Sequence, residues 1–261
     1  MADLYFLGGQ DLEMTEIRHL LEQHAPGRYC DKRLAWGAKF SDYTDDIAAT
    51  LDAGDTPVFI ELIDDLPPEA FDRARAAVID HHGPLAGHDR PTSIEQLFAR
   101  LGLPQTQWTP RLALIAANDR GHIAAMKEMG ASTAEMAAIR EEDRAAQGVT
   151  VEDEVEAERA IAARRSEGRL TIVETVSRTS SAIADQMHVD LGGPGYERLI
   201  VVMPGKFAAF GDGAMITALA AAFPGSYWGG DLPRAGFWGM DLPQDSLHDE
   251  VLARIETIVR A

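Results

Sequence analysis

The sequence contains a single cysteine, Cys30, among its 261 residues. One thiol cannot form an intramolecular disulfide or a cysteine metal cluster. Any bound metal must therefore be held by histidine and carboxylate side chains. A packing role suits this cysteine better than a role as a nucleophile.

Long hydrophobic runs are also missing. The sequence has no apolar stretch of about 18 residues, the length that crosses a bilayer. Its first residues, Met1 to Leu4, lack the basic and apolar regions of a secretory signal. We therefore expect a cytoplasmic protein without a membrane partner.

Basic residues are scarce, because 24 Lys and Arg stand against 42 Asp and Glu and give a formal net charge of −18. Proteins bind nucleic acids chiefly by neutralising phosphates with Lys and Arg, so this acidity disfavours a long DNA or RNA partner. A small anion held by a metal is not excluded. The acidic charge is also explained if it serves only to keep the protein soluble. The sequence leaves the oligomeric state open, and a homodimer is one alternative.

The first half of the sequence alternates short apolar strands with helices. We expect strands at 3–7, 34–40, 57–62 and 77–80, and helices at 14–24, 42–51, 67–77 and 92–101. Strands at this spacing with helices between them predict an α/β fold with a doubly wound, mostly parallel sheet.

The second half predicts a smaller α+β domain. Residues 112–117 fit a helix or a strand, and residues 123–165 predict two or three helices. Strands near 170–173, 199–203 and 207–210 alternate with helices at 179–188, 214–223 and 246–260. The predicted division is a first domain at 1–145, a helical linker at 146–168 and a second domain at 169–261.

A DHH triplet, Asp80-His81-His82, follows the apolar run that ends at Ile79. Successive side chains of a strand point to opposite faces, and strand ends of an α/β sheet open into the crevice that binds ligands. One imidazole can then bind a metal while the other reaches a substrate oxygen. A motif of three residues often occurs by chance, so a metal site also requires other candidate ligands in the sequence.

Acidic residues occupy other strand ends and strand-to-helix turns, namely Asp11, Glu61 and Asp119. With His81 they suit Mn, Fe or Zn, or Mg if most ligands are oxygens. Each acid also has an ordinary alternative as a helix cap, an edge-strand residue or a turn former. As a set, they favour a metal site that activates water.

In order and spacing, several segments within residues 1–125 resemble the DHH superfamily of metal-dependent phosphoesterases. The segments are Gly8-Gly9-Gln10-Asp11, Phe59-Ile60-Glu61-Leu62, Asp80-His81-His82, Pro91-Thr92-Ser93-Ile94-Glu95 and Asp119. The superfamily includes manganese pyrophosphatases, oligoribonucleases, single-strand exonucleases and cyclic-dinucleotide phosphodiesterases. The resemblance implies a hydrolase of a small anionic phosphoester or nucleotide, with Mn as the expected metal and Fe, Zn or Mg as alternatives.

The resemblance also implies roles for individual residues. One ion would be held by Asp11, Glu61, His81 and Asp119. His82, oriented by Asp80, would donate a proton to the leaving group, and His122 would be an extra ligand or a proton donor. The superfamily's first motif offers a histidine and two aspartates, whereas only Asp11 follows the two glycines here, which predicts the loss of one metal site.

The segment from Gly229 to Phe237 is similar to the glycine-rich substrate-binding segment of the superfamily's C-terminal domain, although the histidine of that motif is absent. This similarity implies that Gly229, Gly230 and Arg234 bind substrate. Arg234 and Arg90 would clamp its negative charge across a cleft between the domains. Arg234 has an alternative as an ordinary surface residue.

Other functions remain open at this stage. The chain could be a degenerate DHH-like binding or sensor module without turnover, or a hydrolase of a small molecule that carries no phosphate. A structural homo-oligomer would use its histidines as ordinary polar residues and would bind no stoichiometric metal. Similarly, Gly8-Gly9 could bring backbone N–H groups to a phosphate or only permit tight packing. Trp228 and Trp238 could stack on a ring or pack in the core.

Overall fold

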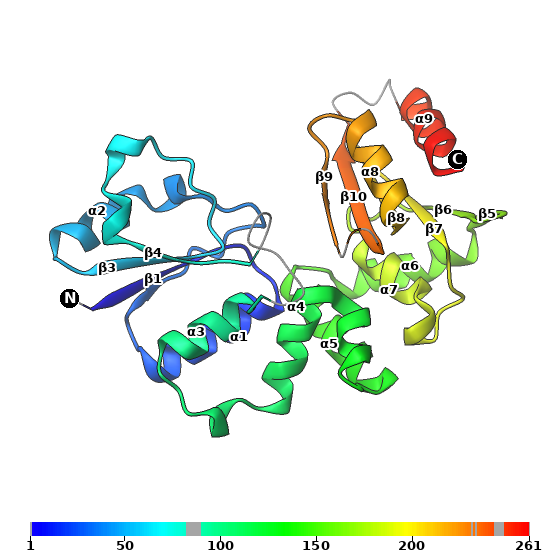
Figure 1. Cartoon of the computed structure of the whole chain (residues 1–261). Helices are drawn as coiled ribbons and strands as arrows, with labels where there is room; N and C mark the ends of the chain where they lie inside the picture. Colours follow the sequence, from blue (N-terminus) through cyan, green and yellow to red (C-terminus); the bar gives the residue numbers. More distant parts are fainter. Residues whose placement is uncertain (1, 82–89, 231, 233, 243–247, 261) are drawn as a thin grey trace. The chain divides into compact units, whose positions relative to one another are not determined.

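A computed structural model describes residues 2–81, 90–230, 232, 234–242 and 248–260. The chain forms two compact units (Figure 1). The first unit comprises Met1–Ala131 and Ala138–Gln147, and the second comprises Ser132–Ala137 and Gly148–Ala261.

The first unit is built on a parallel sheet whose described strands have the order β2-β1-β3-β4. The strands are β1 (Asp3–Leu7), β2 (Tyr29–Cys30), β3 (Thr56–Ile60) and β4 (Ala77–Ile79). The helices are α1 (Leu12–His24), α2 (Thr44–Asp52), α3 (Ser93–Arg100), α4 (Pro110–Glu128) and the part of α5 (Thr133–Ala146) from Ala138 onward, whose first turn is counted with the second unit. Because the chain extends the sheet to both sides of β1, the predicted doubly wound α/β sheet is confirmed.

Helices cover both faces of this sheet. Tyr5 and Leu7 of β1 pack in a core formed with α1, α3 and α4, whereas Phe6 packs with α2 on the opposite face. Figure 1 shows α1 and α3 on one side of the sheet and α2 on the other. Since the strands are parallel, the turns that follow β1, β3 and β4 meet at one edge, which we call the carboxyl edge.

Two glycines bring the turn after β1 into close contact with the turn after β3 and with the segment at Ala35 and Trp36. A Cβ atom on Gly8 would lie 2.5 Å from the carbonyl oxygen of Glu61 and 2.7 Å from that of Ile60. A Cβ atom on Gly9 would lie 2.7 Å from Cα of Trp36. The contacts support the packing role of the Gly8-Gly9 pair, because no larger residue fits between the two turns.

We expect Gly8→Ala to lower the free energy of unfolding by about 2–3 kcal/mol, because the added methyl group overlaps the Glu61 backbone. Gly102→Ala is the comparison, since Gly102 has a φ of +66° but open space around it, and we expect a loss of about 1 kcal/mol there. Urea denaturation measures both changes. Equal losses in the two variants would contradict the contact argument.

Residues 67–77 do not form the predicted helix. They contain two short 3₁₀ turns, Pro68–Ala70 and Arg73–Arg75, separated by Phe71 in an extended conformation with φ −165° and ψ 161°. The Phe71 ring centroid lies 6.0 Å from that of Phe59 and 6.3 Å from that of Phe40. Packing of this ring on the sheet therefore overrides the helical pattern.

The strand predicted at 34–40 is also wrong, because Leu34 and Lys39 form only isolated bridges, to Gly9 and Ile63 respectively. The strand beside β1 at this edge of the sheet is instead β2, which lies earlier in the chain, at Tyr29–Cys30. The ambiguous run at 112–117 is helical, because Thr109 caps α4 by accepting a hydrogen bond from the Leu112 backbone N–H at 3.2 Å.

The second unit contains a mixed sheet with the described strand order β5-β6-β7-β8-β10-β9. Its strands are β5 (Arg165–Glu167), β6 (Leu170–Glu174), β7 (Arg198–Met203), β8 (Lys206–Asp212), β9 (Tyr227–Gly229) and β10 (Ala235–Asp241). Its helices are α6 (Val151–Ala162), α7 (Ser181–Met187), α8 (Gly213–Ala222) and α9 (His248–Arg260). The predicted second α+β region is thus present.

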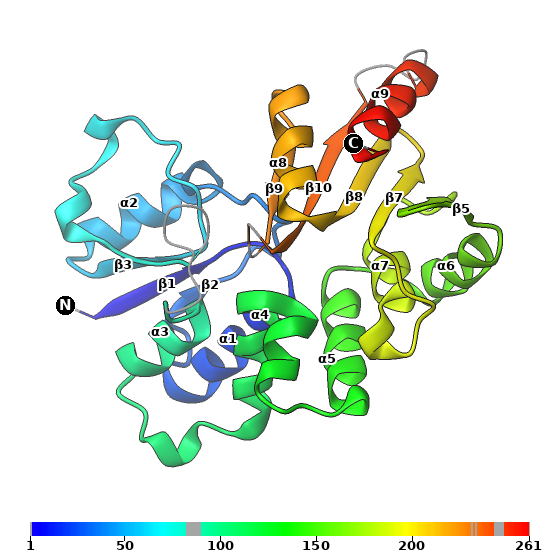
Figure 2. The ribbon, with the colours of Figure 1, turned by 45° about the vertical axis from the view of Figure 1, so that its right-hand side comes forward.

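Helices cover both faces of the second sheet as well (Figure 2). Ala157 and Ala160 of α6 pack with α7 on one face, while α8 and α9 pack on the other. The stretch that we expected as a linker therefore contains a helix that contributes to the core of the second unit. Trp238 is fully buried in this core, whereas Trp228 is 54% exposed. None of the described helices is long and apolar enough to span a membrane.

Candidate metal centre

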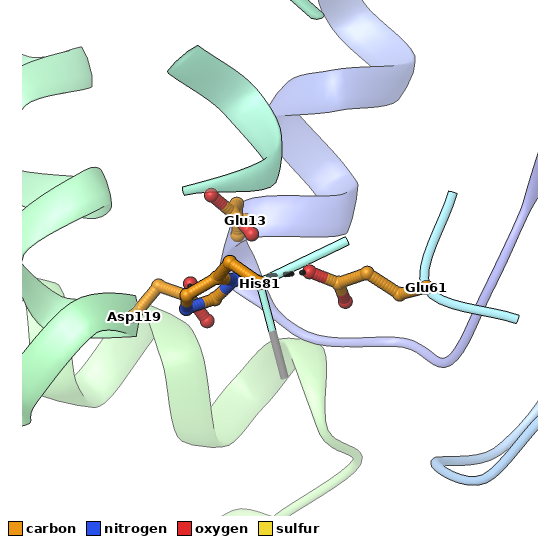
Figure 3. A group of neighbouring side chains, drawn as sticks. All are labelled: Glu13, Glu61, His81 and Asp119. Atoms are coloured by element: carbon orange, nitrogen blue, oxygen red, sulfur yellow. Dashed lines mark ion pairs between the residues drawn. The ribbon is translucent and has the colours of Figure 1, made fainter. Parts of the chain in front are cut away.

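Four side chains meet at the carboxyl edge of the parallel sheet. We call them the ligand cluster: Glu13, Glu61, His81 and Asp119. Each offers a ligand atom, and these atoms all lie within 4.8 Å of one another. Figure 3 shows the four side chains converging from separate parts of the first unit. The described residues hold one such group, so the fold gathers three of the predicted ligands, Glu61, His81 and Asp119, with one that was not predicted.

His81 lies at the centre of the ligand cluster. Its Nε2 atom is 2.7 Å from an oxygen of Asp119, and its Nδ1 atom is 3.8 Å from an oxygen of Glu61. Burial lowers the pKa of His81, but the hydrogen bonds and charges of Asp119 and Glu61 outweigh burial and raise the pKa to about 10. Without a metal ion, the raised pKa favours the positively charged ring, which carries a proton on both nitrogens. A bound cation would take the place of this positive charge between the carboxylates.

Glu13 is the ligand that the sequence analysis missed. It lies in the first turn of α1 and is only 2% exposed. One carboxylate oxygen accepts a hydrogen bond of 2.9 Å from the Ile94 backbone N–H at the start of α3, where the helix dipole favours an anion. The other oxygen, Oε2, makes no hydrogen bond within the described residues. Glu13 follows Asp11 by two positions, and this acid-x-acid spacing after the glycines is the signal that could have identified it.

Glu61 follows β3 directly and has an unusual backbone conformation. Its φ of +53° lies in the left-handed region, which is costly for a residue with a side chain. A hydrogen bond of 3.0 Å from its N–H to the Ile79 carbonyl and the close approach of Gly8 hold it there. Backbone strain of this kind clusters at functional sites.

Asp119 does not lie at a strand end, so its expected position is wrong. It lies inside α4, just before a break in the helix at Gly121 and His122, where His122 has φ 51° and ψ −140°. The helix therefore carries Asp119 to the carboxyl edge from outside the sheet.

Asp11 and His122, the remaining predicted ligands, lie outside the four-residue group. Asp11 caps α1 by accepting a hydrogen bond of 2.7 Å from the Met14 backbone N–H. Burial and the charges of Glu61 and Asp119 raise the pKa of the Asp11 carboxyl well above its usual range. The Nδ1 atom of His122 lies 3.1 Å from Arg140 Nη1.

The other predicted site residues are less closely defined. The backbone carbonyl of Asp80 accepts a hydrogen bond of 3.0 Å from Gln96. Arg90 is exposed just before α3, and His82 lies outside the described residues. The assignment of these residues to substrate or catalysis remains a prediction.

In the second unit, Gly229 and Gly230 follow one another at the end of β9. A Cβ atom on Gly230 would lie 2.5 Å from Cα of Gly236, so close packing against β10 accounts for glycine at this position. Arg234 lines a pocket of about 400 Å³ within this unit, together with Arg169 and Asp212 among others. The anion-binding role of Arg234 stays a prediction.

The composition of the ligand cluster fits a divalent cation. Three carboxylates and one imidazole are a ligand set suited to Mn, Fe or Zn. Burial raises the pKa of Glu13 well above its usual range, and the charges of Asp119, Glu61 and Asp11 raise it further. A cation would relieve this repulsion and would give Oε2 of Glu13 a partner.

No protein-family model matches the sequence, and no curated protein matches it either. Among solved structures, the chain is similar to an exopolyphosphatase-related protein from Bacteroides fragilis, with a TM-score of 0.52, 11% identity and coverage of 99% of this chain and 92% of the other. RecJ in complex with Mn²⁺ from Thermus thermophilus gives a TM-score of 0.50 at 11% identity, and the match covers 99% of this chain but 52% of RecJ. The pGpG-specific phosphodiesterase PggH from Vibrio cholerae gives a TM-score of 0.42 at 12% identity, with coverage of 99% of both chains. At these identities, the likeness concerns the fold.

Proposed function

We propose that this chain, which has the fold of the DHH superfamily, is a metal-dependent hydrolase of a small phosphoester or nucleotide. The observation that carries the proposal is the buried ligand cluster at the carboxyl edge of the parallel sheet, where α/β proteins bind their ligands. Manganese is the proposed metal, since the ligand set suits it and the similar RecJ structure contains Mn²⁺. Fe, Zn and Mg are the alternatives.

A divalent ion held by the ligand cluster would lower the pKa of an attacking water and offset negative charge on the phosphoryl group. The chain would supply the remaining groups. His82, next to the ligand His81, is the proposed proton donor to the leaving group, and Asp80 would orient it. Arg90 and Arg234 are the proposed contacts for the negative charge of the substrate.

A small substrate agrees with the charge of the chain. The formal net charge of −18 repels a long polyanion, and this repulsion is weaker for a molecule that carries few phosphates. Accordingly, we propose mononucleotide-sized or dinucleotide-sized esters as the substrate class.

The proposal is tested with chelator-treated protein and the phosphodiester bis(p-nitrophenyl) phosphate, alongside a panel of short nucleotides. We expect turnover only after Mn²⁺ is restored. His82→Ala should lower the turnover rate by about 10²-fold or more while Mn²⁺ binding survives. The matched control is His19→Ala, because the His19 side chain is 51% exposed on α1.

Two results would contradict parts of this proposal. Mn²⁺ binding without turnover of any phosphoester in the panel would indicate a ligand-binding module. Wild-type turnover in His82→Ala would exclude the proton-donor role while leaving the metal centre intact.

A further inference from the structure

A buried arginine connects α5 to the break in α4. Arg140 is only 4% exposed, and its Nη1 atom lies close to acceptors on both helices. The acceptor atoms are Asn118 Oδ1 at 3.0 Å, His122 Nδ1 at 3.1 Å and Asp143 Oδ2 at 2.7 Å. One guanidinium group therefore contacts residues on both sides of Asp119.

Asp143 extends this connection to α1. Its Oδ1 atom accepts a hydrogen bond of 3.1 Å from the Leu12 backbone N–H, and its Oδ2 atom accepts one of 3.1 Å from Gln147 as well as the bond from Arg140. Leu12 is the first residue of α1 and directly precedes the ligand Glu13. Since helix N-termini leave backbone N–H groups without intrahelical partners, Asp143 supplies an acceptor that α1 lacks.

His122 also contacts Arg140. A guanidinium group carries only donors, so the 3.1 Å contact between Arg140 Nη1 and His122 Nδ1 suits the tautomer whose ring proton lies on Nε2. This bond holds the ring of a residue whose φ of 51° is unfavourable. This contact ties the helix break at His122 to α5.

We infer that Arg140 and Asp143, which we call the α5 clasp, are positioning residues for the metal centre. The inference rests on the proposed function. Through Asn118 and His122, the clasp fixes the helix break that presents Asp119, and through Leu12 it fixes the helix start that presents Glu13. Two members of the ligand cluster, Glu13 and Asp119, thus lie beside backbone segments that the clasp holds.

Another arginine, Arg111 on α4, provides a matched control. Arg111 also ties α4 to α5, because it pairs with Glu142 and with Glu16 of α1. Its side chain is 45% exposed, and neither Glu16 nor Glu142 directly precedes or follows a member of the ligand cluster in the sequence. Breaking this pair tests whether any loss of α4–α5 contact affects the metal centre.

The test compares Arg140→Met, Arg140→Lys and Arg111→Met by titration with Mn²⁺ and by the electron paramagnetic resonance spectrum of the bound ion. We expect Arg140→Met to weaken Mn²⁺ binding by about 10–100-fold and to change the spectrum, as is typical when groups that orient metal ligands are lost. Arg140→Lys keeps the charge beside Asp143 but loses the planar fork, so we expect about 10-fold weaker Mn²⁺ binding in this variant. It provides the test if Arg140→Met does not fold. Arg111→Met should bind Mn²⁺ like the wild type.

A double variant separates positioning from general stability. In Asp119→Asn, one of the ligands that the clasp positions is already impaired, so adding Arg140→Met should weaken the residual Mn²⁺ binding by less than it does in the wild type. An equal loss in both backgrounds, or wild-type affinity and spectrum in both Arg140 variants, would overturn the inference. Absence of Mn²⁺ binding by the wild-type protein would instead contradict the proposed function, and the clasp would lose its role with it.

Discussion

His81→Ala is expected to abolish stoichiometric Mn²⁺ binding and to lower the rate of phosphoester hydrolysis by about 10³-fold, which corresponds to about 4 kcal/mol of transition-state stabilisation. The imidazole is the nitrogen ligand of the cluster and lies between the carboxylates of Asp119 and Glu61. Its removal leaves those carboxylates without the group that bridges them.

Activity and bound metal should be measured on the same samples, with turnover assays beside elemental analysis. Because His81 is only 5% exposed, His81→Asn accompanies the alanine variant as a polar replacement that leaves a smaller cavity. His19→Ala controls for the loss of a histidine elsewhere. Retention of about one Mn²⁺ per chain and wild-type turnover in both His81 variants would refute the metal centre as assigned.

Glu13→Gln should change stability in opposite directions with and without metal. In chelated protein we expect the free energy of unfolding to rise by about 1 kcal/mol, because a buried carboxylate beside other acidic groups is replaced by a neutral amide. The amide oxygen can still accept the hydrogen bond from the Ile94 backbone N–H. The raised pKa of Glu13 has the same cause, namely burial beside the carboxylates of Asp119, Glu61 and Asp11.

In the presence of Mn²⁺ the order of stability should reverse. An ion at about 100 times its dissociation constant stabilises the wild-type fold by about 2.7 kcal/mol. For a protein of this size, we expect the unfolding temperature to rise by about 5–10 °C. Glu13→Gln removes an anionic ligand and should gain less than about half of that stabilisation at the same ion concentration.

Urea denaturation with chelator and with Mn²⁺ measures both changes. Glu22→Gln is the matched control on α1, since Glu22 is not part of the ligand cluster and accepts a hydrogen bond from Tyr29 at an exposed position. Destabilisation of the chelated Glu13 variant, together with an undiminished Mn²⁺ effect, would show that Glu13 has a structural role only.

The sequence carried enough information to predict the first sheet and part of the candidate metal centre. Glu61 and His81 follow apolar strands, and parallel strands bring their carboxyl ends to the same edge of a sheet. Local pattern and strand geometry therefore suffice for these two ligands. The doubly wound order follows from the same alternation of strands and helices.

The ligands on helices required the folded structure. Glu13 is held by the backbone N–H of Ile94, 81 positions later in the chain, and no local pattern encodes this contact. Asp119 was expected at a turn, because the apolar run before it fits a strand as well as a helix. The run lies in a helix that begins after the Thr109 cap, and Asp119 lies just before the break at Gly121 and His122.

Long-range packing also explains the errors outside the site. The helical pattern of residues 67–77 is overridden by the Phe71 ring, which packs beside Phe40 and Phe59. The role of the clasp residue Arg140 likewise depends on contacts with residues that are distant in the sequence. Its partners on α4 lie 18 and 22 positions earlier in the chain, and sequence spacing alone does not distinguish it from a surface arginine.

Anomalous diffraction from crystals of the protein soaked in Mn²⁺ would test the central claim most directly. We expect an anomalous peak bounded by Glu13, Glu61, His81 and Asp119, and we expect this peak to be absent from crystals of His81→Ala grown and soaked in the same way. A peak elsewhere in the first unit, with none at the ligand cluster, would contradict the assignment of these four residues as the metal centre.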